Sequence, residues 1–318
     1  MQNFSEMDNW SSEQVVQFKE DGQLHRRTIT SPTLHIDPDE IDEVESKAND
    51  SAGESAKFST GSFKLPVAQE TNLGRIVAEG DSCFDYAPAG TDIIACLQNL
   101  FGYDISNYAK AGDTLENMIY GTRIDSRFNR VSPTINQVLR RLAELKPKVF
   151  LFSGGGNDVA GEEFESYLNH KVSGLPVLRQ DYINYTINQV FRKYFEDLIA
   201  KVASVSPDTY IITHGYAHTP ATGKGVGILG FSFIGPWLLP ALAKKGIEDE
   251  VERRQIVFSM IDTYNEMLAD LGKTYSKFRY IDLRGMLDPD QDWANELHLR
   301  NSAFSRVAER IHKEIQSV

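Results

Sequence analysis

The feature that most constrains the fold is a regular alternation of two kinds of segment from residue 73 onward. Short segments rich in β-branched and aromatic residues predict strands, and longer segments with apolar residues at helical spacing separate them. Residues 148–152 form an unbroken apolar run, which is typical of a strand buried on both faces of a parallel sheet. The alternation predicts an α/β fold with a parallel sheet, whose strands are expected at residues 76–78, 103–108, 148–152, 210–213 and 278–283.

The helices are expected between these strands and after the last one. A helix should begin at Ser132, with the serine as N-cap and Pro133 in the first helical position. In the C-terminal segment, apolar side chains recur every three or four positions between Phe304 and Ile315, which predicts one buried helix face. The remaining helices are expected at residues 91–101, from 112 onward, 181–205 and 250–271.

Length and charge limit the domain organisation and the partners. The 318 residues are enough for one large α/β domain, and a hydrophobic content of 41% allows a sizeable core. The net charge of -12 argues against a nucleic-acid partner and against anionic membrane surfaces. Residues 1–60 are acidic and poor in aromatic side chains, so we expect a poorly ordered leader or partner-binding arm there, followed by one domain over residues 61–318.

An apolar stretch interrupts the alternation between the fourth and fifth strands. Residues 225–243 contain no charged side chain, but glycines and prolines break the run, so it is not expected to form an integral membrane segment. We predict an insertion at about residues 218–250, which either forms a lid or acyl-binding wall beside the site or packs into the core. Residues 225–230 match the GxGxxG pattern, but neither a strand before them nor a helix after them supports dinucleotide binding.

The sequence gives few indications of a cofactor or of a targeting signal. The two cysteines, Cys83 and Cys96, belong to no cluster with histidines, so neither a zinc site nor a disulfide is expected. The first residues show no basic patch followed by an apolar run. We therefore expect a cytoplasmic protein, although export without a cleavable signal would leave no mark.

The chemistry-bearing residues follow the ends of the predicted strands. Gly80-Asp81-Ser82 comes directly after the first strand, which places Ser82 at the carboxyl edge of the sheet, where open α/β sheets bind ligands. Gly112 follows the second strand and can offer an unobstructed backbone N–H. After the third strand, three glycines precede Asn157, whose amide can donate toward developing negative charge. A serine nucleophile with oxyanion donors is one interpretation of this set.

A serine nucleophile needs a base, and histidine is the residue type best suited to it. His298 lies after the fifth strand and just before the last helix, so it can meet Ser82 at the same sheet edge. His214 follows the fourth strand and can line a pocket there. Trp237 lies in the apolar stretch, and we include it with His214 as a substrate-binding candidate.

These motifs together resemble the SGNH/GDSL hydrolase family, from about residue 74 to the C-terminus. The matching positions are Gly80-Asp81-Ser82, Gly112, Gly155-Gly156-Asn157-Asp158 and His298. The resemblance implies a flavodoxin-like three-layer α/β/α sandwich with a five-stranded parallel sheet, and esterase or lipase chemistry without a metal or organic cofactor. It implies Ser82 as nucleophile and His298 as base, with an oxyanion hole made by the N–H groups of Ser82 and Gly112 and the amide of Asn157.

One position departs from the family pattern. Three residues before His298, where the family usually has aspartate, this chain has Asn295, and Leu299 replaces the proline that often follows the histidine. In a serine-protease triad, the equivalent Asp-to-Asn change costs roughly four orders of magnitude in rate. Either Asn295 or Asp292 is expected to orient His298.

The resulting hypothesis is a serine hydrolase that cleaves a small-molecule or lipid-like carboxylic ester through an acyl-enzyme. The alternatives are a carbohydrate O-acetylesterase, a thioesterase and a catalytically weakened binding module.

Overall fold

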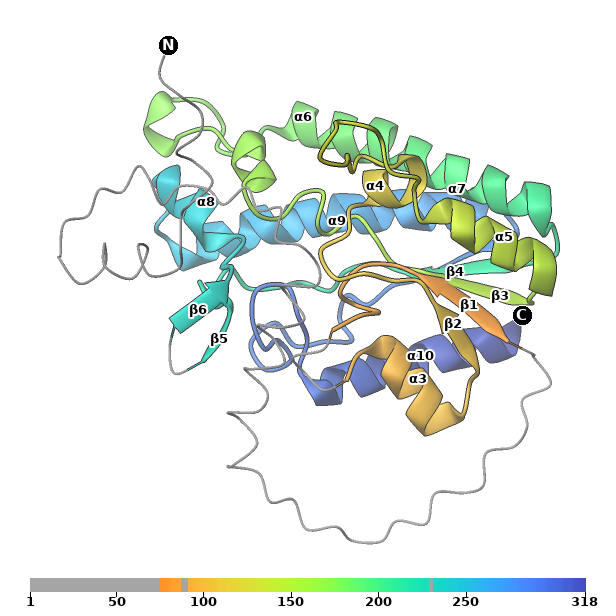
Figure 1. Ribbon diagram of the computed structural model, residues 1–318. Helices are drawn as coiled ribbons and strands as arrows, with labels where there is room; N and C mark the ends of the chain where they lie inside the picture. Colours follow the sequence, from red (N-terminus) through yellow and green to blue (C-terminus); the bar gives the residue numbers. More distant parts are fainter. Residues whose placement is uncertain (1–74, 87–90, 229–230) are drawn as a thin grey trace, which may run out of the picture. The chain divides into compact units, whose positions relative to one another are not determined.

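The computed structural model of the chain describes residues 75–86, 91–228 and 231–318 (Figure 1). The predicted acidic segment at residues 1–60 lies outside this part. In the described part, a parallel sheet of five strands has the order β2-β1-β3-β4-β7, which confirms the predicted fold class. The strands are β1 (Ile76–Glu79), β2 (Ile105–Asn107), β3 (Val149–Phe152), β4 (Tyr210–His214) and β7 (Phe278–Ile281).

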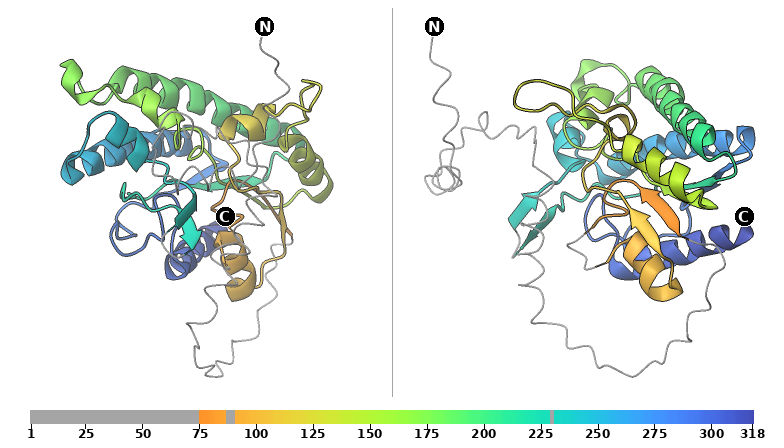
Figure 2. Two further views of the ribbon diagram at one scale, coloured as in Figure 1. Left: turned by 60° about the vertical axis from the view of Figure 1, so that its left-hand side comes forward. Right: turned by 45° about the vertical axis from the view of Figure 1, so that its right-hand side comes forward.

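Helices cover both faces of the sheet, as the two views of Figure 2 show. On one face lie α3 (Ile93–Phe101) and α10 (Asn301–Ser317), and on the other lie α4 (Leu115–Tyr120), α5 (Ile135–Leu145), α7 (Arg192–Val205) and α9 (Glu250–Thr274). The strands supply side chains to both layers: Val77 packs under α4 and α5, whereas Ile76 and Ala78 pack against α3 and α10. This alternation follows from the two-residue period of a strand and explains why the strands are apolar throughout.

The apolar stripe predicted for the C-terminal helix is confirmed. Phe304, Val307, Ile311 and Ile315 on α10 are all buried, and they pack with the inward face of α3. The helix α3 begins at Ile93 rather than at residue 91, because the Asp92 side chain caps it by accepting the N–H of Ala95 at 2.7 Å.

Two helix predictions need correction. The helix expected from Ser132 begins at Ile135, because the chain at Pro133 and Thr134 makes tighter i→i+3 bonds first, and Thr134 occupies the N-cap position. The single helix expected at residues 181–205 consists of α6 (Gln180–Tyr185), the π-helical turn Thr186–Phe191 and α7. No proline or glycine marks this π-helical turn in the sequence.

The sheet order creates a crevice at the carboxyl end of β1. The chain passes from β1 to β2 on one side and then returns to place β3 on the other, so β1 lies at the point where the strand order reverses. Open parallel sheets bind their ligands at such a switch point, outside the carboxyl ends of the strands. Ser82 follows β1 and therefore lies at this position.

The predicted insertion forms its own small structure after β4. It contains an antiparallel pair, β5 (Val226–Ile228) and β6 (Phe231–Ile234), followed by α8 (Leu239–Lys244). The GxGxxG pattern thus overlaps a hairpin strand instead of joining a strand to a helix. Among the described residues, no helix is both long and apolar enough to cross a membrane.

Two glycine replacements test the packing at this sheet edge and in α9. A Cβ on Gly80 would lie 2.9 Å from Ser153 Cβ and 3.0 Å from Ser153 O, so Gly80→Ala should lower the free energy of unfolding by about 1–3 kcal/mol. A Cβ on Gly272, inside α9, would lie 3.6 Å from its nearest neighbour, Tyr280 Cβ. Gly272→Ala should therefore raise the free energy of unfolding by about 0.5–1 kcal/mol. Urea unfolding of both variants measures the difference, and equal effects would contradict the packing described here.

Candidate active site

Asp81 holds the turn that presents Ser82. Its carboxylate is 2% exposed and accepts three hydrogen bonds, from the Cys83 N–H at 3.0 Å, the Ser153 hydroxyl at 2.8 Å and the Tyr216 hydroxyl at 2.7 Å. Because these donors come from the turn itself, from the end of β3 and from the loop after β4, Asp81 ties three strand ends together. Asp81 therefore shapes the turn, and Ser82 is left half-buried with its hydroxyl directed to a different partner.

That partner is His298. Its Nε2 lies 2.9 Å from Ser82 Oγ, so the structure brings together the two residues that the sequence places 216 positions apart. The imidazole is 7% exposed, and it stacks on the Tyr86 ring with 3.9 Å between centroids and 10° between planes. The Trp237 ring packs edge-on against the imidazole, with 5.6 Å between the ring centroids. Two aromatic side chains thus fix the plane of the imidazole.

Asn295 fixes the proton on that imidazole. Its Oδ1 accepts the backbone N–H groups of Leu297 and His298, both at 2.9 Å, and lies 3.0 Å from His298 Nδ1. Its Nδ2 donates to the Tyr86 hydroxyl at 3.2 Å. Because two backbone donors require the amide oxygen to face inward, Nδ1 must carry the ring proton, and Nε2 is left with a lone pair for the Ser82 proton.

Asp292 lies elsewhere. Its carboxylate pairs with Arg306 at 2.5 Å and accepts the Asp288 N–H at 2.7 Å. Partial burial raises the pKa of Asp292, but Arg306 and the Asp288 N–H outweigh it and lower that pKa below its usual value. Of the two candidates for orienting His298, the structure therefore places only Asn295 against the imidazole.

Burial keeps the His298 imidazole neutral. Desolvation lowers its pKa to about 3, and the Asp81 carboxylate opposes this shift only in part. A neutral imidazole with a free Nε2 can accept a proton, which is the state that a general base needs. Among the described residues, the Nδ1 partner is the neutral Asn295 amide and not a carboxylate that could offset the charge that would then form.

Three groups are expected to act as oxyanion donors: the N–H groups of Ser82 and Gly112 and the Asn157 amide. Among the described residues, neither the Ser82 nor the Gly112 N–H makes a hydrogen bond, so both are available to a ligand. Gly112 has φ 75°, a left-handed conformation that favours glycine. The Asn157 amide donates one N–H to the Asp113 carbonyl at 2.9 Å, and the residue lines the pocket beside Ser82.

Asp158 joins the loop after β3 to the helix that follows Gly112. Its carboxylate accepts the N–H of Leu115 at 2.7 Å and that of Glu116 at 3.3 Å, and so caps α4 from another part of the chain. Burial raises the pKa of Asp158 to about 7, although both of these bonds act against the shift. Together with the Asn157 bond to Asp113, this cap fixes the two glycine-containing loops relative to each other.

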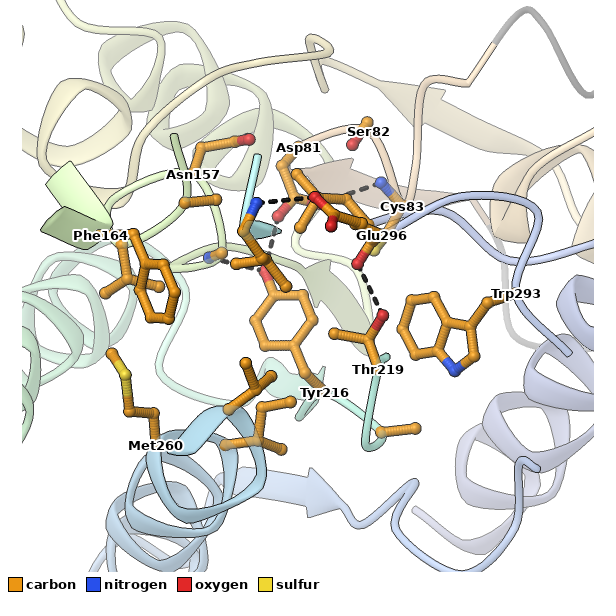
Figure 3. A pocket seen from close by; sticks show the side chains of 18 residues that line it. Asp81, Ser82, Cys83, Asn157, Phe164, Tyr216, Thr219, Met260, Trp293 and Glu296 are labelled. Carbon is orange, nitrogen blue, oxygen red and sulfur yellow. Dashed lines mark hydrogen bonds between the residues drawn. The ribbon is translucent and has the colours of Figure 1, made fainter. Parts of the chain in front are cut away.

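A largely apolar pocket opens beside Ser82 (Figure 3). It encloses about 680 Å³, part of which is open to solvent. Ser82, Asp81 and Asn157 lie along one side, while Phe164 and Met260 lie across from them in this view. Apolar side chains from the loop after β3, from α9, from the insertion and from the loop before α10 make most of the walls: Val159, Ala160, Phe164, Leu238, Val257, Met260, Ile261, Trp293 and Leu297.

The two substrate-binding candidates from the sequence do not line this pocket. His214 is 3% exposed, its Nδ1 is 2.8 Å from the Gly215 carbonyl, and its ring packs against Phe84, because its position on β4 directs it into the core. Trp237 packs on His298 instead. Trp293 lines the pocket, and sequence reasoning missed it. It lies only five residues before His298, and this proximity to the predicted base could have indicated its role.

In the described part of the chain, no group of three or more His, Cys, Asp or Glu side chains could hold a metal ion. Cys83 and Cys96 are both free thiols.

The comparisons with known proteins agree with this geometry. The model of a family described as GDSL-like lipase/acylhydrolase matches residues 76–311, which include the Ser82 turn, both glycine-containing loops and His298. No curated protein matches the chain at a significant level.

Several solved structures are similar at low identity. The Salmonella ser. Paratyphi A lipopolysaccharide acetyltransferase periplasmic domain is 14% identical, with 78% of this chain and 85% of that chain covered and a TM-score of 0.44. A Clostridium thermocellum family 3 carbohydrate esterase is 13% identical, with 76% and 97% covered and a TM-score of 0.40. A possible lipase from Chitinophaga pinensis is 12% identical, with 76% and 98% covered and a TM-score of 0.44. At these values the likeness gives no information on the substrate of this chain.

The low pKa of His298 predicts an unusual pH profile for hydrolysis of a neutral ester. Because the acid limb of kcat/KM reports the base of the free enzyme, activity should decline little between pH 8 and about pH 5. Asn295→Asp places a carboxylate beside Nδ1, which should raise the pKa of His298 by about 1–3 units and move the acid limb upward.

Asp292→Asn is the matched control, because it removes a nearby carboxylate that does not contact the imidazole. It should leave the acid limb where it is in the parent protein. An acid limb near pH 6.5 in the parent protein would contradict the lowered pKa of the buried His298. A shift caused by Asp292→Asn would contradict Asn295 as the residue that orients the imidazole.

Proposed function

Because the chain belongs to the family of GDSL-like lipases and acylhydrolases, we propose that it is a hydrolase that cleaves carboxylic esters through an acyl-enzyme on Ser82. The observation that carries the proposal is the hydrogen-bonded series from Ser82 Oγ to His298 Nε2 and from His298 Nδ1 to Asn295 Oδ1. In this series the imidazole has the tautomer and the orientation that let Nε2 accept a proton. Ser82 Oγ lies within hydrogen-bond distance of that nitrogen.

The proposed reaction has two halves. Ser82 Oγ attacks the ester carbonyl carbon while its proton moves to His298 Nε2, and the tetrahedral oxyanion accepts hydrogen bonds from the N–H groups of Ser82 and Gly112 and from the Asn157 amide. The alcohol leaves with the proton from His298. A water molecule then attacks the acyl-enzyme with the same base, which releases the acid and restores Ser82.

The pocket favours an apolar acyl group as the substrate part next to Ser82. Most of the side chains that line it are apolar, and they extend from the Ser82 turn to Met260 and Ile261 on α9. This supports an apolar ester over the alternative of a carbohydrate O-acetylesterase. A thioester carries the same acyl group, so the thioesterase alternative is separated by comparing thioesters with oxygen esters of one chain length.

Labelling of Ser82 is the direct test of this function. A fluorophosphonate probe should label the full chain, and Ser82→Ala should abolish both the labelling and the hydrolysis of short p-nitrophenyl esters without unfolding the protein. Circular dichroism and the unfolding midpoint check the fold of the variant. A parent protein that the probe does not label would indicate the remaining alternative, a binding module that has lost its activity, and hydrolysis by Ser82→Ala would overturn the choice of nucleophile.

Filling the pocket tests the choice of acyl group. Ile261 on α9 is half-buried and faces the pocket, so Ile261→Trp should remove room for a longer chain. We expect kcat/KM for p-nitrophenyl octanoate to fall by about 10–100-fold relative to the acetate, which corresponds to losing contacts with two to four methylene groups at about 0.8 kcal/mol each.

The matched control for this test is Val251→Trp, in the exposed first turn of the same helix, where the side chain is 62% exposed. It should leave the ratio of the two esters unchanged. Equal ratios in the parent protein and Ile261→Trp would show that the acyl group does not occupy this pocket.

A further inference from the structure

Glu296 is a buried carboxylate to which the proposed reaction gives no role. It is 0% exposed and lies between Asn295 and His298 in the loop that carries the base. Its two carboxylate oxygens accept four backbone N–H groups. Oε1 accepts those of Gly223 at 2.8 Å and Leu239 at 3.1 Å, and Oε2 accepts those of Trp237 and Leu238, both at 2.7 Å. Each carboxylate oxygen therefore accepts two backbone hydrogen bonds.

All four donors belong to the insertion after β4. Gly223 precedes the β5–β6 hairpin, and residues 237–239 lead into α8, which begins at Leu239 with Leu238 as its N-cap. The first N–H groups of a helix have no partner within the helix, and α8 has no side-chain cap of its own. Glu296 supplies that cap from a position almost 60 residues further along the chain.

The backbone of Glu296 strengthens the same connection. Its N–H donates to the Lys224 carbonyl at 3.3 Å, and its carbonyl accepts the Thr219 hydroxyl at 2.6 Å. Figure 3 shows Glu296 and Thr219 joined in this way at the pocket, with Trp293 nearby. The insertion is thus attached to the loop of the base on both sides of the hairpin.

This attachment reaches both the base and the pocket wall. Leu238, whose N–H binds Glu296, is 5% exposed and lines the pocket beside Leu297. Trp237, the next donor, packs edge-on against His298. One side chain therefore sets the position of the apolar wall relative to the imidazole that acts on the ester.

We propose that Glu296 is a positioning residue that determines acyl-chain selectivity, by holding the insertion against the loop of the base so that Leu238 completes the pocket. This inference rests on the proposed ester hydrolysis at Ser82. Glu296 contacts neither Ser82 nor the imidazole through its side chain, so its loss should change the choice of substrate more than the reactivity of the nucleophile.

Glu296→Gln is the most selective variant, because it keeps the size of the side chain and removes the charge. The glutamine amide has one oxygen acceptor, and its NH2 group would face two N–H donors, so at least two of the four bonds are lost. We expect kcat/KM for p-nitrophenyl octanoate to fall at least about tenfold relative to the acetate, the fold-change typical of losing one hydrogen bond to a charged group. The rate at which a small fluorophosphonate labels Ser82 should remain close to that of the parent protein.

Asp125→Asn is the matched control, because Asp125 also accepts two backbone N–H groups, from Arg127 and Asn129, but lies in an exposed turn away from the pocket. It should leave the ratio of the two esters unchanged. An unchanged ratio in Glu296→Gln overturns the proposal, and so does an equal loss of labelling and of both ester activities, which indicates a structural role only. Absence of labelling in the parent protein is a different outcome, which rejects the proposed function itself.

A measurement on the parent protein covers the case in which Glu296→Gln does not fold. Amide hydrogen exchange of residues 237–239 should be slow, because these N–H groups are bonded to a buried carboxylate, whereas the first amides of a helix are commonly open to water. Fast exchange of these three amides would show that the attachment does not persist in solution, and the proposal would then fail.

Discussion

The geometry of the site depends on one atom, the carboxamide oxygen of Asn295. It accepts the N–H groups of Leu297 and His298 and the ring N–H of the imidazole. The two backbone bonds shape the loop, and the third sets the tautomer of the base. Because the loop itself requires an oxygen at this position, the orientation of His298 follows from the local fold and does not need a separate device.

This explains why an asparagine can stand where related sequences usually have aspartate. In a protease triad, the same exchange is harmful chiefly because the amide allows the wrong tautomer. Here the N–H groups of Leu297 and His298 hold the Asn295 oxygen toward Nδ1, which excludes that tautomer. The remaining disadvantage of asparagine is that it carries no negative charge to stabilise the protonated imidazole. Asp81 is the carboxylate whose charge acts on His298; it is held by the Ser153 and Tyr216 hydroxyls and opposes the desolvation of the imidazole only in part. The imidazole is consequently neutral at rest, and its protonated form is poorly stabilised.

The sequence was sufficient to predict the fold and the places from which Ser82, Gly112, Asn157 and His298 would come, because parallel strands bring their carboxyl ends to one edge of the sheet. It left Asn295 and Asp292 as equal candidates, since the choice depends on how the loop curls and on Arg306, which lies eight residues beyond His298 and pairs with Asp292.

Side-chain direction explains the positions that sequence reasoning missed. His214 is the last residue of β4 and not a loop residue after it, so its side chain points into the core, and the sequence does not show which face the strand presents there. The π-helical turn before α7 contains no proline or glycine that would mark it in the sequence. The pocket itself combines five segments that are distant in the sequence, and its walls become visible only when these are packed together.

Two buried glutamates near the site show how hydrogen bonding decides what a carboxyl group can do. Glu79 at the end of β1 is 0% exposed, and neither of its carboxyl oxygens has a partner in the described part of the chain. Burial, with a further contribution from Asp113, raises its pKa well above the usual value and so favours the neutral form. A carboxyl group without hydrogen-bond partners cannot organise its surroundings.

Glu296 is equally buried but is surrounded by N–H groups, all of them from the backbone. Backbone donors do not depend on which side chains the insertion carries. The residues at positions 237–239 can therefore change without loss of these bonds, provided that none becomes a proline. It follows that the shape of the pocket wall and its attachment to the His298 loop are separable: the side chains of the insertion can change while Glu296 keeps its backbone in place.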